Sequence, residues 1–100
     1  MSDQALFKEV AAEGVRAKRI HGQPADRSGL IWLAILAEEF GEAAKEVVQG
    51  EIQPLNRVQA EYLARLRSEL VQVASVTMRW LAQVDHQYRE AYSEDYDGSK

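Results

Sequence analysis

Apolar residues recur every three to four positions along almost the whole chain, and this spacing constrains the fold more than any other feature. A repeat of 3.6 residues is that of an α-helix with one buried face. No stretch alternates apolar and polar residues at every second position, as a half-buried strand would. We therefore predict an all-α fold, a bundle of three to four helices in each chain.

Glycine and proline divide the helical pattern into three segments. Ser2 is a candidate cap for a first helix that runs to about residue 20, where the segment His21-Gly22-Gln23-Pro24 stops it. A second helix is predicted from residue 29 or 30 to residue 49, with Gly50 as its end. A third begins around Pro54 and continues for about 30 residues, which is long enough for a bend or a break.

The chain is 100 residues long, enough for one domain. We place this domain at residues 1–92 and expect the acidic, polar residues 93–100 to form a flexible tail. The second helix carries apolar side chains on most of its circumference, and such a helix is normally covered on all sides. Association with further copies is the simplest cover, so we predict a homodimer or homotetramer. The apolar residues concerned are Ile31, Trp32, Leu33, Ile35, Leu36, Phe40, Val47 and Val48.

Composition excludes several functional classes. The chain has no cysteine, which rules out disulfides, thiol nucleophiles and cysteine-built zinc or iron–sulfur sites. A net charge of -4 leaves no broad basic surface for a nucleic-acid polymer. The longest apolar run, residues 30–37, is far shorter than the ~20 residues of a membrane span, and the N-terminus lacks the pattern of a secretory signal. We expect a cytoplasmic protein without membrane or nucleic-acid partners.

Acidic residues lie on the apolar faces of two predicted helices. On a helical wheel, Glu42 and Trp32 each lie within about 60° of Glu39. On the third helix, Glu69 lies in the middle of the most apolar stripe. A buried carboxylate without a compensating cation is costly and becomes protonated instead. These acids therefore need a basic side chain or a bound cation.

A basic side chain explains one of these acids, and a bound cation explains the other two. Arg65 precedes Glu69 by four residues, so an ion pair within the helix explains that acid. Glu39 and Glu42 have only Lys45 as a basic neighbour at helical spacing, so a divalent cation is the other explanation.

Antiparallel pairing of the second and third helices favours the cation. It would bring the pairs Glu39–Glu42 and Glu69–Gln72 to within about one turn of the same level. Hard oxygen ligands in this number suit Mg²⁺, and Mn²⁺ is a reasonable substitute.

At these residues the sequence resembles a known family. The segments Glu38-Glu39-Phe40-Gly41-Glu42 and Glu69-Leu70-Val71-Gln72 are similar to the E-E-x-x-E and E-x-x-D signature of MazG-like nucleotide pyrophosphohydrolases, which are all-α enzymes. The stretches LAEEFGEAAKEVVQGE and LRSELVQVASVTMRWLAQVD look most similar to compact phage-type or prophage-type members. The resemblance covers residues 18–85.

The resemblance implies an activity and a set of roles. Members cleave nucleoside or deoxynucleoside triphosphates between the α and β phosphates, releasing the monophosphate and pyrophosphate, and they act as dimers or tetramers with carboxylate-bound Mg²⁺. By motif position, Glu39, Glu42 and Glu69 would be metal ligands, and Gln72 occupies the fourth ligand position. Glu38 would contact a second metal or orient the attacking water, which makes Glu38 and Glu39 the catalytic residues.

The resemblance also indicates substrate contacts. Lys18, His21 and Gln23 match the basic end of the first helix in these relatives, where phosphate or base contacts are expected. Arg79 lies two turns beyond Gln72 and would reach a triphosphate. Trp32, like Trp80, would stack on a base. The alternatives are surface charges for Lys18 and Arg79, a helix cap for His21, and core packing for the tryptophans.

Gln72 departs from the family pattern, which has an aspartate at this position. A neutral amide still offers an oxygen, but it removes one negative charge from the site. The alternative function is therefore a catalytically weakened nucleotide- or metal-binding module, or a helical interaction module with the same fold. A purely structural bundle is a third hypothesis.

Overall fold

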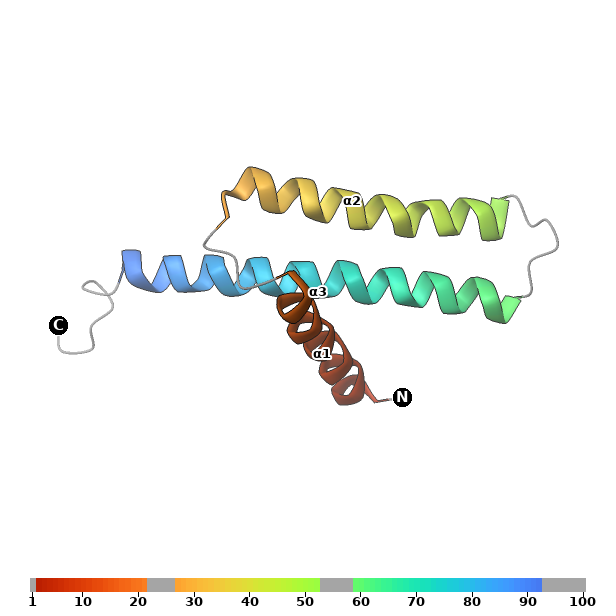
Figure 1. Ribbon diagram of the computed structural model, residues 1–100, viewed down its shortest axis with the longest axis horizontal. Coiled ribbons are helices and arrows are strands. Elements are labelled where there is room, and N and C mark those ends of the chain that lie inside the picture. The colour runs from red at the N-terminus through yellow and green to blue at the C-terminus, as the bar shows by residue number, and fades with distance from the viewer. Residues whose placement is uncertain (1, 22–26, 53–58, 93–100) are drawn as a thin grey trace.

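The computed structural model describes residues 2–21, 27–52 and 59–92, and these residues form helices without any strand. Their order is α1 (Asp3–His21), α2 (Gly29–Val47), the π-helix η1 (Val48–Ile52) and α3 (Gln59–Ala91). The predicted all-α helical bundle is confirmed, and Figure 1 shows its arrangement.

Serine caps begin two of the helices. The hydroxyl of Ser2 accepts a hydrogen bond from the backbone N–H of Ala5 at 3.2 Å. At the start of α2, the hydroxyl of Ser28 accepts one from the N–H of Ile31 at 3.3 Å. Each bond satisfies one backbone donor that the first helical turn leaves unpaired. Because capping is local chemistry, both starts agree with the positions predicted from the sequence.

The predicted end of the second helix at Gly50 is wrong. The helical path continues through η1 as a π turn, with Gly50 inside it. A Cβ atom at Gly50 would overlap the ring of Tyr62 on α3, and the hydroxyl of Tyr62 donates a hydrogen bond to Glu51. The glycine therefore permits close approach of η1 to α3 instead of terminating the helix.

The third helix is a single element of 33 residues, without the break that its length had suggested. Its predicted start near Pro54 lies outside the described residues. The predicted tail, residues 93–100, also lies outside them. The described part of the domain thus extends to residue 92.

The helices α2 and α3 lie side by side and antiparallel, whereas α1 crosses α3 at a steep angle (Figure 1). The crossing is close at Gly14, where a Cβ atom would lie 3.6 Å from the hydroxyl of Ser75. An ion pair from Arg67 on α3 to Glu9 on α1, at 2.5 Å, links the same two helices away from the crossing. This arrangement places the acidic faces of α2 and α3 opposite each other.

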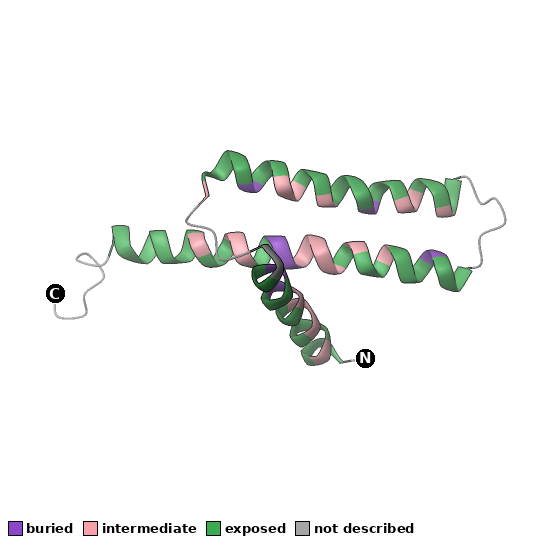
Figure 2. Ribbon diagram, viewed as in Figure 1, coloured by how far each residue is buried: buried purple, intermediate pink, exposed green. Residues whose placement is uncertain are grey.

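The core is narrow. Figure 2 shows that buried positions lie only where helix faces meet. The radius of gyration is 17.5 Å, against about 13 Å for an ordinary domain of this length. Within the described ranges, no helix is both long and apolar enough to cross a membrane. The buried apolar residues are Ala17, Trp32, Ala43, Tyr62 and Val76.

Candidate functional site

Two of the four acidic residues predicted from the sequence lie between α2 and α3. Glu39 and Glu69 are half-buried on the facing sides of these helices, whereas Glu38 and Glu42 are exposed. Burial raises the pKa of the Glu39 carboxyl above its ordinary value, and repulsion from Glu69, Glu38 and Glu42 raises this pKa further. Arg79 acts in the opposite direction on the same pKa. Glu39 is therefore a carboxylate that lacks full compensation.

The ion pair that would have explained Glu69 does not form. Arg65 is exposed and makes no salt bridge with Glu69 in the described part of the chain. Glu69, in the middle of the apolar stripe of α3, is therefore not neutralised by Arg65 of its own helix.

The carboxylate oxygens of Glu39 and Glu69 are ligands of the kind that a hard divalent cation binds. Within residues 2–21, 27–52 and 59–92, no three acidic or histidine side chains come close enough together to hold a metal ion. Mg²⁺, however, is commonly held by one or two carboxylates and completed by water and substrate phosphates. Glu39 with Glu69, one from each helix, supplies such a pair of carboxylates. A bound cation would also relieve the repulsion that raises the pKa of Glu39.

A cavity of about 610 Å³ lies where the three helices meet, and Glu39 is part of its wall. Its other walls are the apolar side chains of all three helices and several charged groups. The size is that of a small-molecule site. Five residues predicted for the site line this cavity: Lys18, Trp32, Glu39, Gln72 and Arg79.

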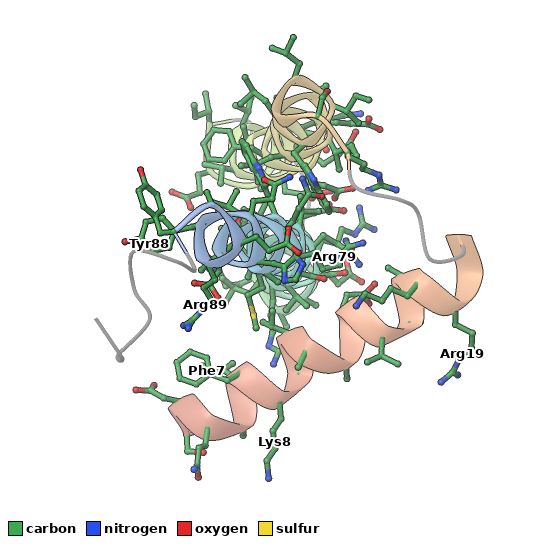
Figure 3. All side chains as sticks on the ribbon, turned by 90° about the vertical axis from the view of Figure 1, so that its left-hand side faces the viewer. Phe7, Lys8, Arg19, Arg79, Tyr88 and Arg89 are labelled. Carbon is green, nitrogen blue, oxygen red and sulfur yellow. The ribbon has the colours of Figure 1, made fainter. Side chains whose placement is uncertain are left out.

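Cations outnumber acids in the lining of the cavity. Arg16, Lys18, Arg27 and Arg79 contribute positive charge, against Glu13 and Glu39. Burial lowers the pKa of Arg79, repulsion from Arg27 lowers it further, and Glu13 and Glu39 oppose that change. Figure 3 shows Arg79 on the side of α3 nearer to α1. The cavity therefore suits an anionic ligand.

Glu13 on α1 is a site residue that the sequence interpretation missed. Its carboxylate accepts three hydrogen bonds from the Arg16 guanidinium, at 2.7, 3.0 and 3.1 Å, and these lower its pKa most. A hydrogen bond from the Gln72 amide lowers this pKa further, as does the charge of Arg79. Gln72, predicted as a metal ligand, is thus engaged with α1. The signal in the sequence was only that Glu13 shares a helical face with Ala17.

Trp32 is buried, with only 5% of its surface exposed. Its ring lies parallel to that of Trp80 at 6.5 Å, and the Arg27 guanidinium lies 5.0 Å from its centroid. Its indole N–H donates to the side-chain oxygen of Gln83 at 2.9 Å. The observed role of Trp32 is therefore packing between α2 and α3, at one wall of the cavity.

Gln83 is a second residue that sequence reasoning missed. Its side-chain oxygen accepts hydrogen bonds from the Arg27 backbone and from Trp32, and its amide donates to the Arg27 carbonyl at 2.7 Å. These bonds hold the start of α2 against α3 and position the Arg27 side chain near the cavity. The partners are more than fifty positions apart, so no local motif marks them.

The remaining predicted contacts lie at the end of α1. Lys18 is exposed at the rim of the cavity. His21 is the last residue of α1, and its side chain lies outside the described part of the structure. Gln23 lies outside the described residues altogether.

Ser75 adds an unusual polar group to the cavity wall. It is 1% exposed, and its hydroxyl has no hydrogen-bond partner among the residues that the structure describes. Buried hydroxyls normally have a partner, so Ser75 departs from the usual pattern, and its oxygen is itself buried beside Gly14 of α1.

Comparisons with known protein families, with curated proteins and with solved structures found no match to this chain.

Proposed function

We propose that this protein is a Mg²⁺-dependent nucleotide pyrophosphohydrolase that converts a nucleoside or deoxynucleoside triphosphate to the monophosphate and pyrophosphate. One observation carries the proposal: Glu39 interacts electrostatically with the other predicted acids, Glu69, Glu38 and Glu42, and is also part of the wall of the cation-lined cavity. A phosphate chain in the cavity would therefore lie next to carboxylates suited to its metal ion. The sequence resemblance to MazG-like enzymes and the cysteine-free composition support action in the cytoplasm.

The metal would be held by Glu39 and Glu69, with Glu42 as the further ligand that the resemblance implies. When bound, Mg²⁺ polarises phosphate oxygens and lowers the pKa of a bound water. Glu38, which is exposed one position before Glu39, would orient the attacking water. The two helices that supply these acids pack against each other, so the ligands belong to one rigid unit.

The cations of the cavity would bind the phosphate chain. Arg79 is the most suitable because it interacts electrostatically with Glu39 and lines the same cavity. Lys18 and Arg27 would add positive charge from the other helix ends. Together these groups favour a polyanion over a neutral ligand.

The test is an assay of purified protein with Mg²⁺ or Mn²⁺ against the common ribo- and deoxyribonucleoside triphosphates. We expect at least one to yield its monophosphate and pyrophosphate. Glu39→Gln and Glu69→Gln should each lower kcat/KM by roughly a hundredfold or more, because each removes a charged metal ligand. Glu61→Gln, at an exposed acid in the first turn of α3, is the matched control and should retain activity. Absence of turnover with every nucleotide and both metals would rule out the enzymatic proposal.

The second candidate function is a nucleotide- or metal-binding module with weakened catalysis. The engagement of Gln72 with Glu13 favours it, because the side chain at the fourth ligand position is neutral and held by α1. This candidate predicts that nucleotide with Mg²⁺ raises the melting temperature while no pyrophosphate appears. A purely structural bundle predicts neither effect. Thermal shift and pyrophosphate release, measured on the same samples, separate the three.

A further inference from the structure

The side chain of Gln83 on α3 holds the backbone of Arg27, the residue just before the cap of α2. The Gln83 oxygen accepts a hydrogen bond from the Arg27 N–H at 3.1 Å, and the Gln83 amide donates one to the Arg27 carbonyl at 2.7 Å. Gln83 follows Arg79 by four positions, so both side chains lie on one side of α3, one turn apart. The backbone of Arg27 is therefore fixed about one helical turn from Arg79.

The face of the Arg27 guanidinium packs on the ring of Trp32. The guanidinium carbon lies 5.0 Å from the centroid of the indole ring, in a cation–π contact. The ring is held in turn by the bond from its N–H to Gln83 at 2.9 Å and by stacking on Trp80. Because stacking uses the face of the guanidinium, the N–H groups at its edge remain available to an anion.

Two guanidinium groups line the same cavity without an ion-pair partner. They belong to Arg27 and Arg79, and among residues 2–21, 27–52 and 59–92 neither forms a salt bridge. Burial lowers the pKa of Arg79, and the charge of Arg27 lowers it further. Nε of Arg79 donates to the carbonyl of Ser75 at 3.3 Å, so its terminal N–H groups can point to a ligand. An anion between the two guanidinium groups would remove their repulsion.

The acids of the cavity do not neutralise this pair. Glu13 accepts three hydrogen bonds of 2.7–3.1 Å from Arg16, so its charge is already matched. Burial and repulsion from other acids raise the pKa of Glu39, and no salt bridge joins Glu39 to Arg79 in the described ranges. Glu39 therefore offsets at most one of the two positive charges of Arg27 and Arg79.

We propose that Arg27 and Arg79 form a site that binds a di- or triphosphate anion without a metal ion, and that Gln83 is the positioning residue of this site. Two guanidinium groups suit a polyphosphate, because each offers paired N–H donors to a tetrahedral oxyanion. A carboxylate carries a single charge and would match only one of them. The proposal rests on the proposed function for the source of the phosphate, which is free pyrophosphate or the phosphate chain of a nucleotide.

The closing experiment is calorimetric titration in EDTA, where a metal-held site does not contribute. We expect inorganic pyrophosphate and a nucleoside triphosphate to bind and a nucleoside not to bind. Arg27→Gln should weaken binding by about tenfold or more, because charged hydrogen bonds are lost. Arg19→Gln removes the same charge from an exposed position of α1 outside the cavity lining, and it should change binding by less than about twofold. Figure 3 shows Arg19 pointing away from α3.

Each outcome of the titration decides the proposal. Binding of pyrophosphate identifies the free anion as a ligand, and binding of the triphosphate alone identifies the nucleotide chain; either supports the site if Arg27→Gln weakens it. No binding in EDTA, or equal losses in Arg27→Gln and Arg19→Gln, would overturn the site. Turnover in Mg²⁺ without binding in EDTA refutes this site and leaves the hydrolase proposal standing, whereas binding in EDTA without turnover does the reverse.

A double-mutant cycle tests the role of Gln83. Gln83→Met keeps the approximate size of the side chain but removes its hydrogen bonds to Arg27 and Trp32. We expect it to weaken pyrophosphate binding by about three- to tenfold, and Arg27→Gln to have little further effect in this background, since the arginine is no longer positioned. Additive effects of the two substitutions would show that Gln83 does not position Arg27.

A measurement on the wild-type chain covers the case in which a variant fails to fold. Phenylglyoxal modifies accessible arginines, and peptide mass spectrometry assigns each modified residue. We expect pyrophosphate in EDTA to slow the modification of Arg27 and Arg79 and to leave that of Arg19 unchanged. Equal rates at Arg27 and Arg79 with and without pyrophosphate contradict the site.

Discussion

At the scale of single residues, the site is defined by how two glutamates are compensated. Glu13 has Arg16 and Gln72 as partners, and its pKa is lowered. Glu39 has mostly other acids around it, and its pKa is raised. The helical wheel could place Glu39 on an apolar face, because that depends on spacing along one helix. It could not identify Glu13 as a site residue, because the contact of Glu13 with Gln72 joins two different helices.

These opposite pKa shifts predict opposite effects on stability in the absence of metal. Glu39→Gln should stabilise the fold at pH 7 by about 0.5 kcal/mol, since it removes repulsion of the kind that like charges on one helix face produce. Glu13→Gln should destabilise it by about 1 kcal/mol, because a charged hydrogen bond to Arg16 is lost. Thermal or urea unfolding measures both, and the same sign for the two variants would contradict the assignment.

The pH dependence of the two carboxyls also differs in sign. The folded state retains the Glu39 proton between its ordinary and its raised pKa, so this group lowers stability as pH rises through that window. The contribution of Glu13 is present above its ordinary pKa and is lost as pH falls through the lowered one. We expect Glu39→Gln to differ from wild type mainly above the raised pKa. Unfolding free energies from pH 3 to 8 measure this difference.

At the scale of elements, the starts of α1 and α2 could be predicted from local chemistry, whereas the path of the chain through η1 could not. Serine at positions 2 and 28 caps its helix through a bond to a residue three positions on, which is visible in the sequence. Gly50 was expected to end α2 because glycine commonly follows a helix. Its actual role depends on the ring of Tyr62, which reaches it from α3. No pattern within one helix contains that contact.

Two glycines of this region should respond oppositely to alanine. Gly50→Ala forces a methyl group against Tyr62 and should destabilise the fold by about 1–3 kcal/mol. Gly41→Ala adds a methyl group with nothing within 4 Å and should stabilise α2 by about 0.5–1 kcal/mol. Chemical unfolding of both variants measures the effects. If Gly50→Ala is neutral, the close approach of η1 to α3 is not as described.

At the scale of the whole molecule, three helices leave much apolar surface in water. The extended shape, with a radius of gyration of 17.5 Å, and the few buried residues follow from α1 crossing α3 instead of closing the bundle. The apolar circumference of the second helix predicts that something covers it, and α1, which packs on α3, leaves Leu30, Leu33 and Phe40 of α2 exposed. Association itself stays a prediction.

If folding and association are linked, stability should depend on protein concentration. We expect the melting temperature of wild type to rise over a hundredfold increase in concentration, because mass action favours the dimer. Phe40→Glu, at an apolar residue of α2 that is 63% exposed, should flatten this dependence. Differential scanning calorimetry at three concentrations tests it. A wild-type melting temperature that does not change with concentration would argue for a stable monomer.

The helices, the serine caps of α1 and α2, and the placement of Glu39 and Glu69 on apolar faces follow from the amino-acid sequence, because each depends on residues within a few positions of one another. The contact of Gln72 with Glu13, the hydrogen bonds by which Gln83 holds the start of α2, and the exposure of apolar residues on α2 follow from how the three helices pack. These features depend on the angle at which α1 crosses α3 and on contacts between residues distant in sequence. Such contacts are selected by packing of whole helices, and local spacing does not specify them.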